Sequence, residues 1–245
     1  MIIYNLVLNS NPFINAYFNS DLFGKCIFIA LISASLISWS LILYKCWLTR
    51  KARKYSTNFQ SIFERHQLDP LTISAEAPKE EINPFRDLYF ILKRQTLELL
   101  RKNRHYASAH PTGETSAYLS TADISLVESH LAGGIAQQSQ KLEAHLFVLA
   151  MIVTLGPFLG LLGTVWGILM SFGEMQSSAA NNQAILGGIS LALATTVLGI
   201  LDAIPALIGY SYLKSSCKAL STDMECFSNE MLAAIELHYR KVDMP

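Results

Sequence analysis

Charged residues are scarce in this chain, which argues against an ordinary soluble domain. Only 16% of its 245 residues are Asp, Glu, Lys or Arg, whereas 51% are hydrophobic. The mean hydropathy is accordingly positive. A soluble domain carries about 25% charged residues, so this composition predicts a protein that places much of its surface in lipid.

The sequence also lacks the motifs that mark enzymes and nucleotide-binding proteins. It contains no G-x-S-x-G, H-E-x-x-H, Walker A or G-x-G-x-x-G pattern. Its six histidines show no metal-ligand spacing, and its four cysteines form no C-x-x-C pair, which predicts free thiols. We therefore expect no catalytic residue, no cofactor, no metal and no nucleic-acid partner. Any work the protein does must draw on another source, most simply an ion gradient.

Long runs without charge are what the sequence has in abundance. Roughly 20 helical residues cross the hydrocarbon core of a bilayer. Three runs are long enough, and we predict membrane helices at 23–45, 146–173 and 184–213, with an outer-side turn at 174–183. Of 19 Lys and Arg residues, 18 lie in 45–145 or after 213, and basic residues beside a span stay in the cytoplasm. The N-terminal segment 1–22 is therefore expected outside and the C-terminus inside.

The two remaining segments, 46–145 and 214–245, are predicted to be cytoplasmic. Three prolines predict a loop at 68–84, and a period of 3.6 in the apolar residues predicts a helix over 85–104. The HPTGE stretch at 110–114 ends that helix. A second helix is expected to begin near Ala122 and to run directly into the second span.

The C-terminal helix carries an apolar stripe at alternating spacings of three and four, made of Cys217, Leu220, Met224, Phe227, Met231 and Ala234. Two interpretations stay open, packing within one subunit and association between subunits. The predicted fold class is all-α, a three-span transmembrane protein whose long helices extend into a cytoplasmic helical bundle.

Small residues recur along one face of the second and third spans. In the second span they are Gly156, Gly160, Gly163 and Gly167; in the third they are Gly188, Ala192, Thr196, Gly199 and Ala203. Such stripes let two helix backbones approach closely, which a lipid-facing anchor does not need. We expect the two stripes to pack against each other.

Thr164 and Thr196 are the candidate polar residues of these two spans. Counted from the outer ends at 1.5 Å per residue, they lie within roughly 6 Å in depth. Antiparallel packing can therefore place both on one polar patch. In the alternative interpretation, each hydroxyl bonds only the carbonyl four residues earlier on its own helix.

Apart from Lys25 and Lys45 near the two ends of the first predicted span, Asp202 is the only formally charged residue within the predicted spans, and it shares a helix face with Thr195 and Leu191. Charged groups at membrane depth are expensive and mark functional sites. Asp202 is therefore a candidate proton carrier. The alternative is a residue at the cytoplasmic edge of the hydrocarbon, bonded to water or a hydroxyl.

A resemblance to a known family lies in two stretches, GPFLGLLGTVWGILMSF at 156–172 and LALATTVLGILDAIPALIGYSYL at 191–213. They resemble the TolQ/ExbB members of the MotA/TolQ/ExbB proton channel family. The resemblance implies a homo-oligomeric, pentameric ring in the bacterial inner (cytoplasmic) membrane, surrounding two helices of a TolR/ExbD-type single-span partner. A TolA/TonB-type protein is implied as a further partner, with membrane lipid around the ring. It also implies that Thr164 and Thr196 face the channel.

The chain departs from that family at two positions of the third span. The family usually carries a glutamate where this sequence has Leu191, and a small residue where it has Asp202. Their shared face allows Asp202 to take over the carboxylate three turns further inward. Two functions of different class stay open: a proton channel subunit serving envelope integrity or outer-membrane uptake, and a non-conducting scaffold that assembles a ring or anchors partners.

Overall fold

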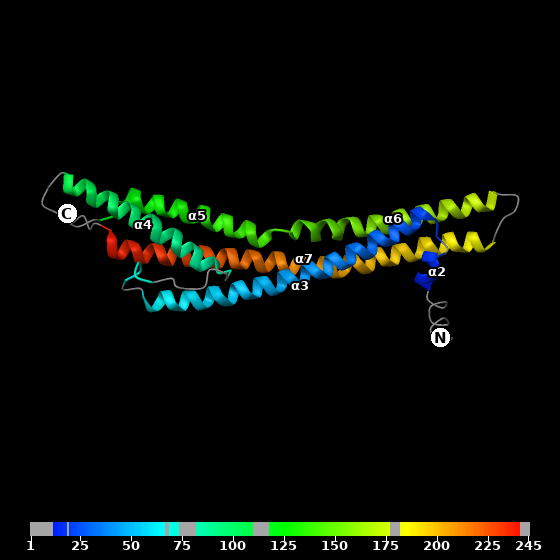
Figure 1. Ribbon diagram of the computed structural model, residues 1–245, viewed down its shortest axis with the longest axis horizontal. Coiled ribbons are helices and arrows are strands. Elements are labelled where there is room, and N and C mark those ends of the chain that lie inside the picture. The colour runs from blue at the N-terminus through cyan, green and yellow to red at the C-terminus, as the bar shows by residue number, and fades with distance from the viewer. Residues whose placement is uncertain are drawn as a thin grey trace. The chain divides into compact units, whose positions relative to one another are not determined.

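The computed structural model describes residues 12–18, 20–66, 69–73, 82–109, 118–176 and 182–240. These residues form six helices: α2 (Pro12–Phe18), α3 (Leu22–Arg65), α4 (Pro84–Ala109), α5 (Thr121–Glu143), α6 (Leu146–Gln176) and α7 (Asn182–Tyr239). Three of them, α3, α6 and α7, are long and apolar enough to cross a membrane. The predicted all-α, three-span fold class is confirmed (Figure 1).

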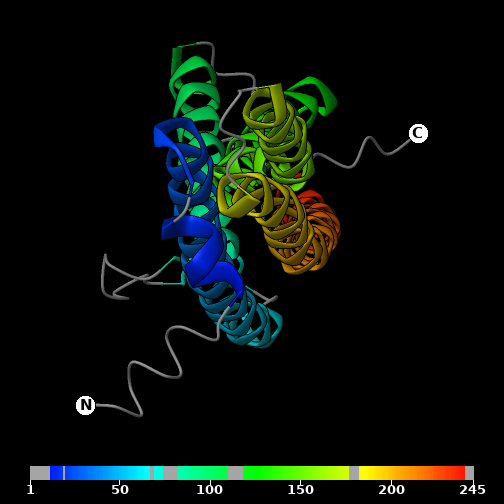
Figure 2. The same cartoon turned by 90° about the vertical axis from the view of Figure 1, so that its right-hand side faces the viewer.

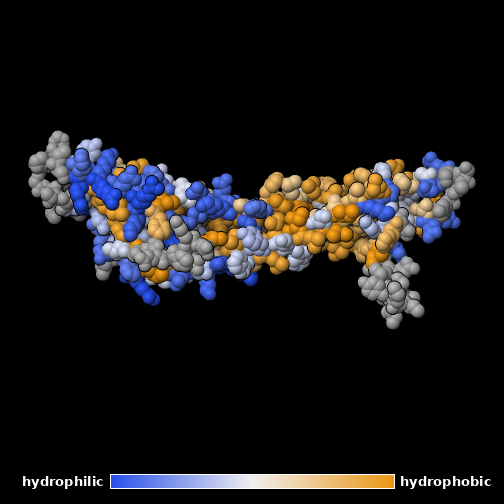
Figure 3. Space-filling model, viewed as in Figure 1, coloured by the Kyte–Doolittle hydropathy of each residue, from blue (hydrophilic) through white to orange (hydrophobic). Residues whose placement is uncertain are grey.

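The chain divides into two compact units. The membrane unit contains Met1–Lys45 and His145–Leu213, and the polar unit contains Cys46–Ala144 and Lys214–Pro245. Helices α3 and α7 contribute residues to both. Hydrophobic side chains dominate the visible face of the membrane unit, whereas hydrophilic ones gather over the polar unit (Figure 3). This division follows the charge distribution of the sequence.

In the membrane unit, the helices meet along their small and apolar faces. Figures 1 and 2 both show α6 beside the first part of α7, with α2 next to the start of α3. Ala16 of α2, Phe28 of α3, and Leu191 and Ala194 of α7 form one buried cluster. Within the expected outer-side segment, residues 1–11 and 19 lie outside the described part of the chain. Helix α2 of that segment is therefore anchored to two spans.

In the polar unit, Phe227 of α7 is the centre of an aromatic core. Its ring stacks on Phe85 of α4 at 4.6 Å between centroids and meets Phe63 of α3 edge-on at 5.4 Å. The apolar stripe predicted on α7 is buried here, within one chain, from Cys217 to Met231, and Ile235 rather than Ala234 continues it. Packing within one subunit therefore accounts for this stripe.

The prediction that the second cytoplasmic helix runs directly into the second span is wrong. Helix α5 begins after Ser120, whose side chain caps it, and ends at Glu143. His145 then adopts a left-handed conformation with φ 69°, and α6 begins at Leu146. Histidine is among the residues that tolerate this region best. No proline or glycine marks the break, so the sequence carries no local sign of it.

The remaining helix ends lie close to the proline and turn residues of the sequence. Pro84 occupies the first turn of α4, where its missing N–H costs nothing. The helix ends at Ala109, and the expected break at 110–114 lies outside the described residues. Helices α6 and α7 both continue through an internal proline, Pro157 and Pro205 respectively.

Candidate functional site

The interface between α6 and α7 is built on backbone contact. All four glycines of the α6 stripe are buried, and each faces α7. A methyl group added to Gly199 would lie 2.7 Å from the carbonyl oxygen of Gly156, and one added to Gly188 would lie equally close to that of Gly167. A methyl group added to Gly167 of α6 would likewise lie 2.9 Å from the backbone nitrogen of Ala192 of α7. The two helices therefore touch where only glycine or alanine fits.

Thr164 and Thr196 meet across this interface. Their hydroxyl oxygens are 2.6 Å apart. Thr164 also bonds the carbonyl of Gly160 at 3.0 Å, and Thr196 bonds the carbonyls of Ala192 and Gly160 at 3.2 and 3.3 Å. The polar patch is therefore formed, and the alternative in which each hydroxyl bonds only its own helix is wrong, because each hydroxyl bonds its own helix and also the other threonine.

The chemistry of this pair follows from counting its protons. A hydroxyl has one proton to donate and two lone pairs that accept. When Thr164 donates to Thr196, Thr196 donates to a backbone carbonyl, and the reverse arrangement uses the same groups. Both side chains are half-buried, so the pair keeps lone pairs within reach of a further donor. It can therefore exchange hydrogen bonds with a carboxylic acid placed beside it.

Thr195, the neighbour of Thr196, has a different environment. It is completely buried, bonds the carbonyl of Leu191 at 2.9 Å, and fills the notch that Gly163 leaves in α6. The sequence placed it on the face of Asp202 but did not indicate its contact with α6. Because its hydroxyl is satisfied within its own helix and shielded, we assign it a packing role.

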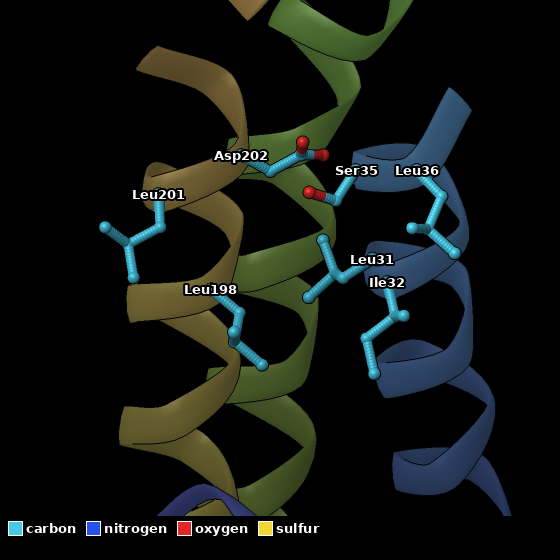
Figure 4. Close-up of a pocket in the computed structure, with 7 residues that line it drawn as sticks. All are labelled: Leu31, Ile32, Ser35, Leu36, Leu198, Leu201 and Asp202. Carbon is cyan, nitrogen blue, oxygen red and sulfur yellow. The ribbon is translucent and has the colours of Figure 1, made fainter. Parts of the chain in front are cut away.

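Asp202 lies on another side of α7 and is not brought to the threonine pair. Its side chain points into a pocket of about 210 Å³ between α7 and α3, lined by Leu31, Ile32, Ser35, Leu36, Leu198, Leu201 and Asp202 itself (Figure 4). The residue is 4% exposed, and neither carboxylate oxygen has a hydrogen-bond partner among the described residues. Leu191, three turns earlier, lies in the cluster with α2 and α3.

Two further polar residues of the membrane unit make contacts that the sequence alone did not indicate. Ser35 of α3 directs its hydroxyl toward the Asp202 carboxylate (Figure 4). Asp21 precedes α3, accepts a hydrogen bond from the backbone N–H of Gly24 at 3.0 Å, and accepts another from the indole Nε1 of Trp166 at 3.0 Å. Asp21 thus caps α3 and ties it to α6. An acidic residue just before an apolar run is the signal that could have indicated this cap.

Comparison with known proteins places these features in a family. The MotA/TolQ/ExbB proton channel family matches residues 102–226 of the chain. The Biopolymer transport protein ExbB of Neisseria meningitidis is 26% identical over 208 residues, covering 84% of this chain and 88% of that protein. The Tol-Pal system protein TolQ of Haemophilus influenzae is 24% identical over 220 residues, covering 89% and 91%. The ExbB protein of Aquifex aeolicus is 34% identical over 102 residues, covering 41% and 69%.

Proposed function

This chain belongs to the MotA/TolQ/ExbB proton channel family, and we propose that it forms a ring around a TolR/ExbD-type single-span partner. In this proposal the ring couples proton-motive force to envelope integrity or outer-membrane uptake. Among the relatives are proteins named for biopolymer transport and for the Tol-Pal system. The proposal therefore includes both envelope integrity and outer-membrane uptake. The hydroxyl pair of Thr164 and Thr196 is the observation that carries the proposal.

The threonine pair suits a proton route that a partner's carboxylic acid shares. An acid in apolar surroundings is stabilised only where hydrogen-bonding groups face it. Thr164 and Thr196 supply such groups on a surface made mostly of glycine and aliphatic residues. Because both hydroxyls also have backbone acceptors on their own helices, they can turn toward a partner or away from it without being left unbonded.

Ring formation is supported by what one chain leaves uncovered. The outward faces of α6 and α7 expose large apolar side chains, among them Phe158, Leu161, Val165, Leu169, Leu193, Val197, Ile200 and Ile204. In a pentamer these faces meet neighbouring copies, the partner's helices and membrane lipid. The proposed location is the bacterial inner membrane with the N-terminus outside. The basic residues lie almost entirely in 45–145 and after 213, and such residues beside a span stay in the cytoplasm.

The proposal is tested by proton flux into liposomes that contain the ring and its co-purified single-span partner. Thr164→Val and Thr196→Val keep the side-chain shape and remove the hydroxyl. A hydrogen bond to a charged group contributes about 1.5 to 3 kcal/mol, so each change should slow proton flux roughly ten- to a hundredfold. Native mass spectrometry should show the same ring in the variants and the wild type.

Thr154→Val is the matched control, because Thr154 lies on the same helix and, among the described residues, bonds only the carbonyls of Ala150 and Met151. It should conduct like the wild type. Full flux in both Thr164→Val and Thr196→Val would contradict the proposed proton route. A ring that assembles, retains its partner and never conducts would instead support the scaffold interpretation.

A further inference from the structure

The pocket around Asp202 is separate from the threonine pair. Thr196 faces α6, whereas Asp202 faces α3 across the pocket of about 210 Å³. The two residues are six positions apart on α7, which places them roughly 9 Å apart along the helix axis and on different sides of it. A role for Asp202 therefore needs its own chemical explanation.

A charged carboxylate in this pocket has nothing to balance it. Five of the seven lining residues are leucine or isoleucine, and no described group hydrogen-bonds either oxygen of Asp202. An ionised carboxylate removed from water without a partner is costly, so such groups are paired, bound to a cation or neutralised. The geometry therefore requires a positive charge that the protein itself does not supply.

The surrounding helices carry no titratable side chain close to this level. Helix α3 has none between Cys26 and Tyr44, and α7 has none other than Asp202 before Tyr210. Helix α6 has none before Glu174. No lysine, arginine or histidine is therefore available to pair with Asp202 from any of the three helices. The compensating charge must come from outside the chain.

We propose that Asp202, together with Ser35, forms a second proton-binding site of this subunit, on the α3 side of α7. The side chains that line the pocket offer three oxygens, two from the carboxylate and one from the Ser35 hydroxyl, in otherwise aliphatic surroundings (Figure 4). Metal cations that prefer oxygen take about six or more such ligands, which this donor set does not provide. A proton needs only one of them, and the resulting acid can donate to the Ser35 hydroxyl.

Two further groups within a turn of the pocket suit the water that would carry protons to it. The hydroxyl of Ser38 is buried and has no hydrogen-bond partner among the described residues. Pro205 has no N–H to give to the carbonyl of Leu201, four residues earlier. Unsatisfied polar groups at a roomy polar site are where buried water is held. Both lie on the helices that form the pocket.

Carbodiimide labelling tests the site without relying on the proposed function, since it needs neither a partner nor a proton gradient. Dicyclohexylcarbodiimide reacts with protonated carboxylic acids in apolar surroundings. The carboxyl oxygen adds to the central carbon, the acid proton moves to one nitrogen, and the adduct rearranges to a stable N-acylurea. The purified full chain in liposomes should acquire one adduct at Asp202, located by peptide mass spectrometry. Its yield should fall as the pH is raised.

The controls use residues of the same unit. Asp202→Asn should abolish the adduct while leaving the ring intact, and Asp202→Glu should restore it. Asp21 is an internal control, because its carboxylate already accepts two hydrogen bonds and should stay unlabelled. Ser35→Ala should change the pH at which labelling is lost. A Ser35→Ala profile that matches the wild type would remove Ser35 from the site.

Two results would overturn the proposal. Sodium chloride that protects Asp202 at constant pH, where choline chloride does not, would assign the pocket to a metal cation. Absence of any adduct at acidic pH, with Asp202→Asn as stable as the wild type, would make Asp202 a water-bonded structural residue. Proton flux that survives in Asp202→Asn while Thr196→Val abolishes it would leave the proposed function standing and place this site outside the main route.

Discussion

The α6–α7 interface makes a quantitative prediction, because one methyl group has nowhere to go. In Gly199→Ala the new Cβ would lie 2.7 Å from the carbonyl oxygen of Gly156 and 3.2 Å from the Cα of Gly160. Both are backbone atoms, so no side chain can rotate away. Ordinary contact begins at 3.4 Å, and the helices must therefore separate locally by roughly 0.7 Å, losing contacts on both sides.

The expected cost follows from two opposing terms. Forcing an extra methyl into a packed interior costs about 1 to 3 kcal/mol, while replacing a helical glycine with alanine returns about 0.5 to 1 kcal/mol. The two terms differ by about 0 to 2.5 kcal/mol, so Gly199→Ala should lower the free energy of unfolding by roughly 1 kcal/mol. Gly173→Ala is the matched control, because a Cβ there meets no described residue within 4 Å. It should leave stability unchanged or raise it.

Unfolding of the detergent-solubilised protein, followed by the loss of helical circular dichroism, measures both variants. The comparison should show Gly199→Ala less stable than Gly173→Ala, with the wild type between them or equal to the control. If Gly199→Ala proved as stable as Gly173→Ala, α6 and α7 would not be in backbone contact at this position. The packing described for the membrane unit would then be refuted.

Three further predictions address assembly, topology and pH. Gly163→Leu should break the ring into smaller species by native mass spectrometry, and an unchanged ring would show that this glycine does not hold the assembly together. In a cysteine-free background, a cysteine at Ser178 should react with an impermeant thiol reagent added from outside, and one at Ser74 should not; the reverse result would invert the topology. Burial alone would raise the pKa of Asp123, but hydrogen bonds from Ser120 and Asn103 and the charge of Lys102 lower it. Because the folded pKa lies below the unfolded one, this carboxylate stabilises the polar unit above the unfolded pKa and loses that effect as the pH falls through the folded pKa. Asp123→Asn should therefore flatten the acid limb of the stability profile, and an unchanged limb would contradict the argument.

Much of the fold could be predicted because it depends on signals carried along single helices. A long run without charged residues indicates a membrane span, whichever helices pack beside it. Small residues at spacings of three and four indicate a helix face that another helix can approach closely. The break at His145 has no such signal. Nothing in the sequence around it favours a turn, since neither glycine nor proline is present, although His145 adopts a left-handed conformation.

The limits of the sequence are clearest at Asp202. The helical periodicity places Leu191, Thr195 and Asp202 on one side of α7, but it does not say which neighbouring helix that side will meet. Thr195 contacts Gly163 of α6, whereas Leu191 and Asp202 face α3, because the helix surface is shared between two neighbours. A serine such as Ser35 in an apolar span is unremarkable until a carboxylate is placed opposite it. The threonine pair and Asp202 therefore lie on separate interfaces of α7, and Leu191 shares the α3 side with Asp202. Substitutions at Asp202 and at Thr196 should accordingly act independently on stability, which is the expectation for sites without a shared partner.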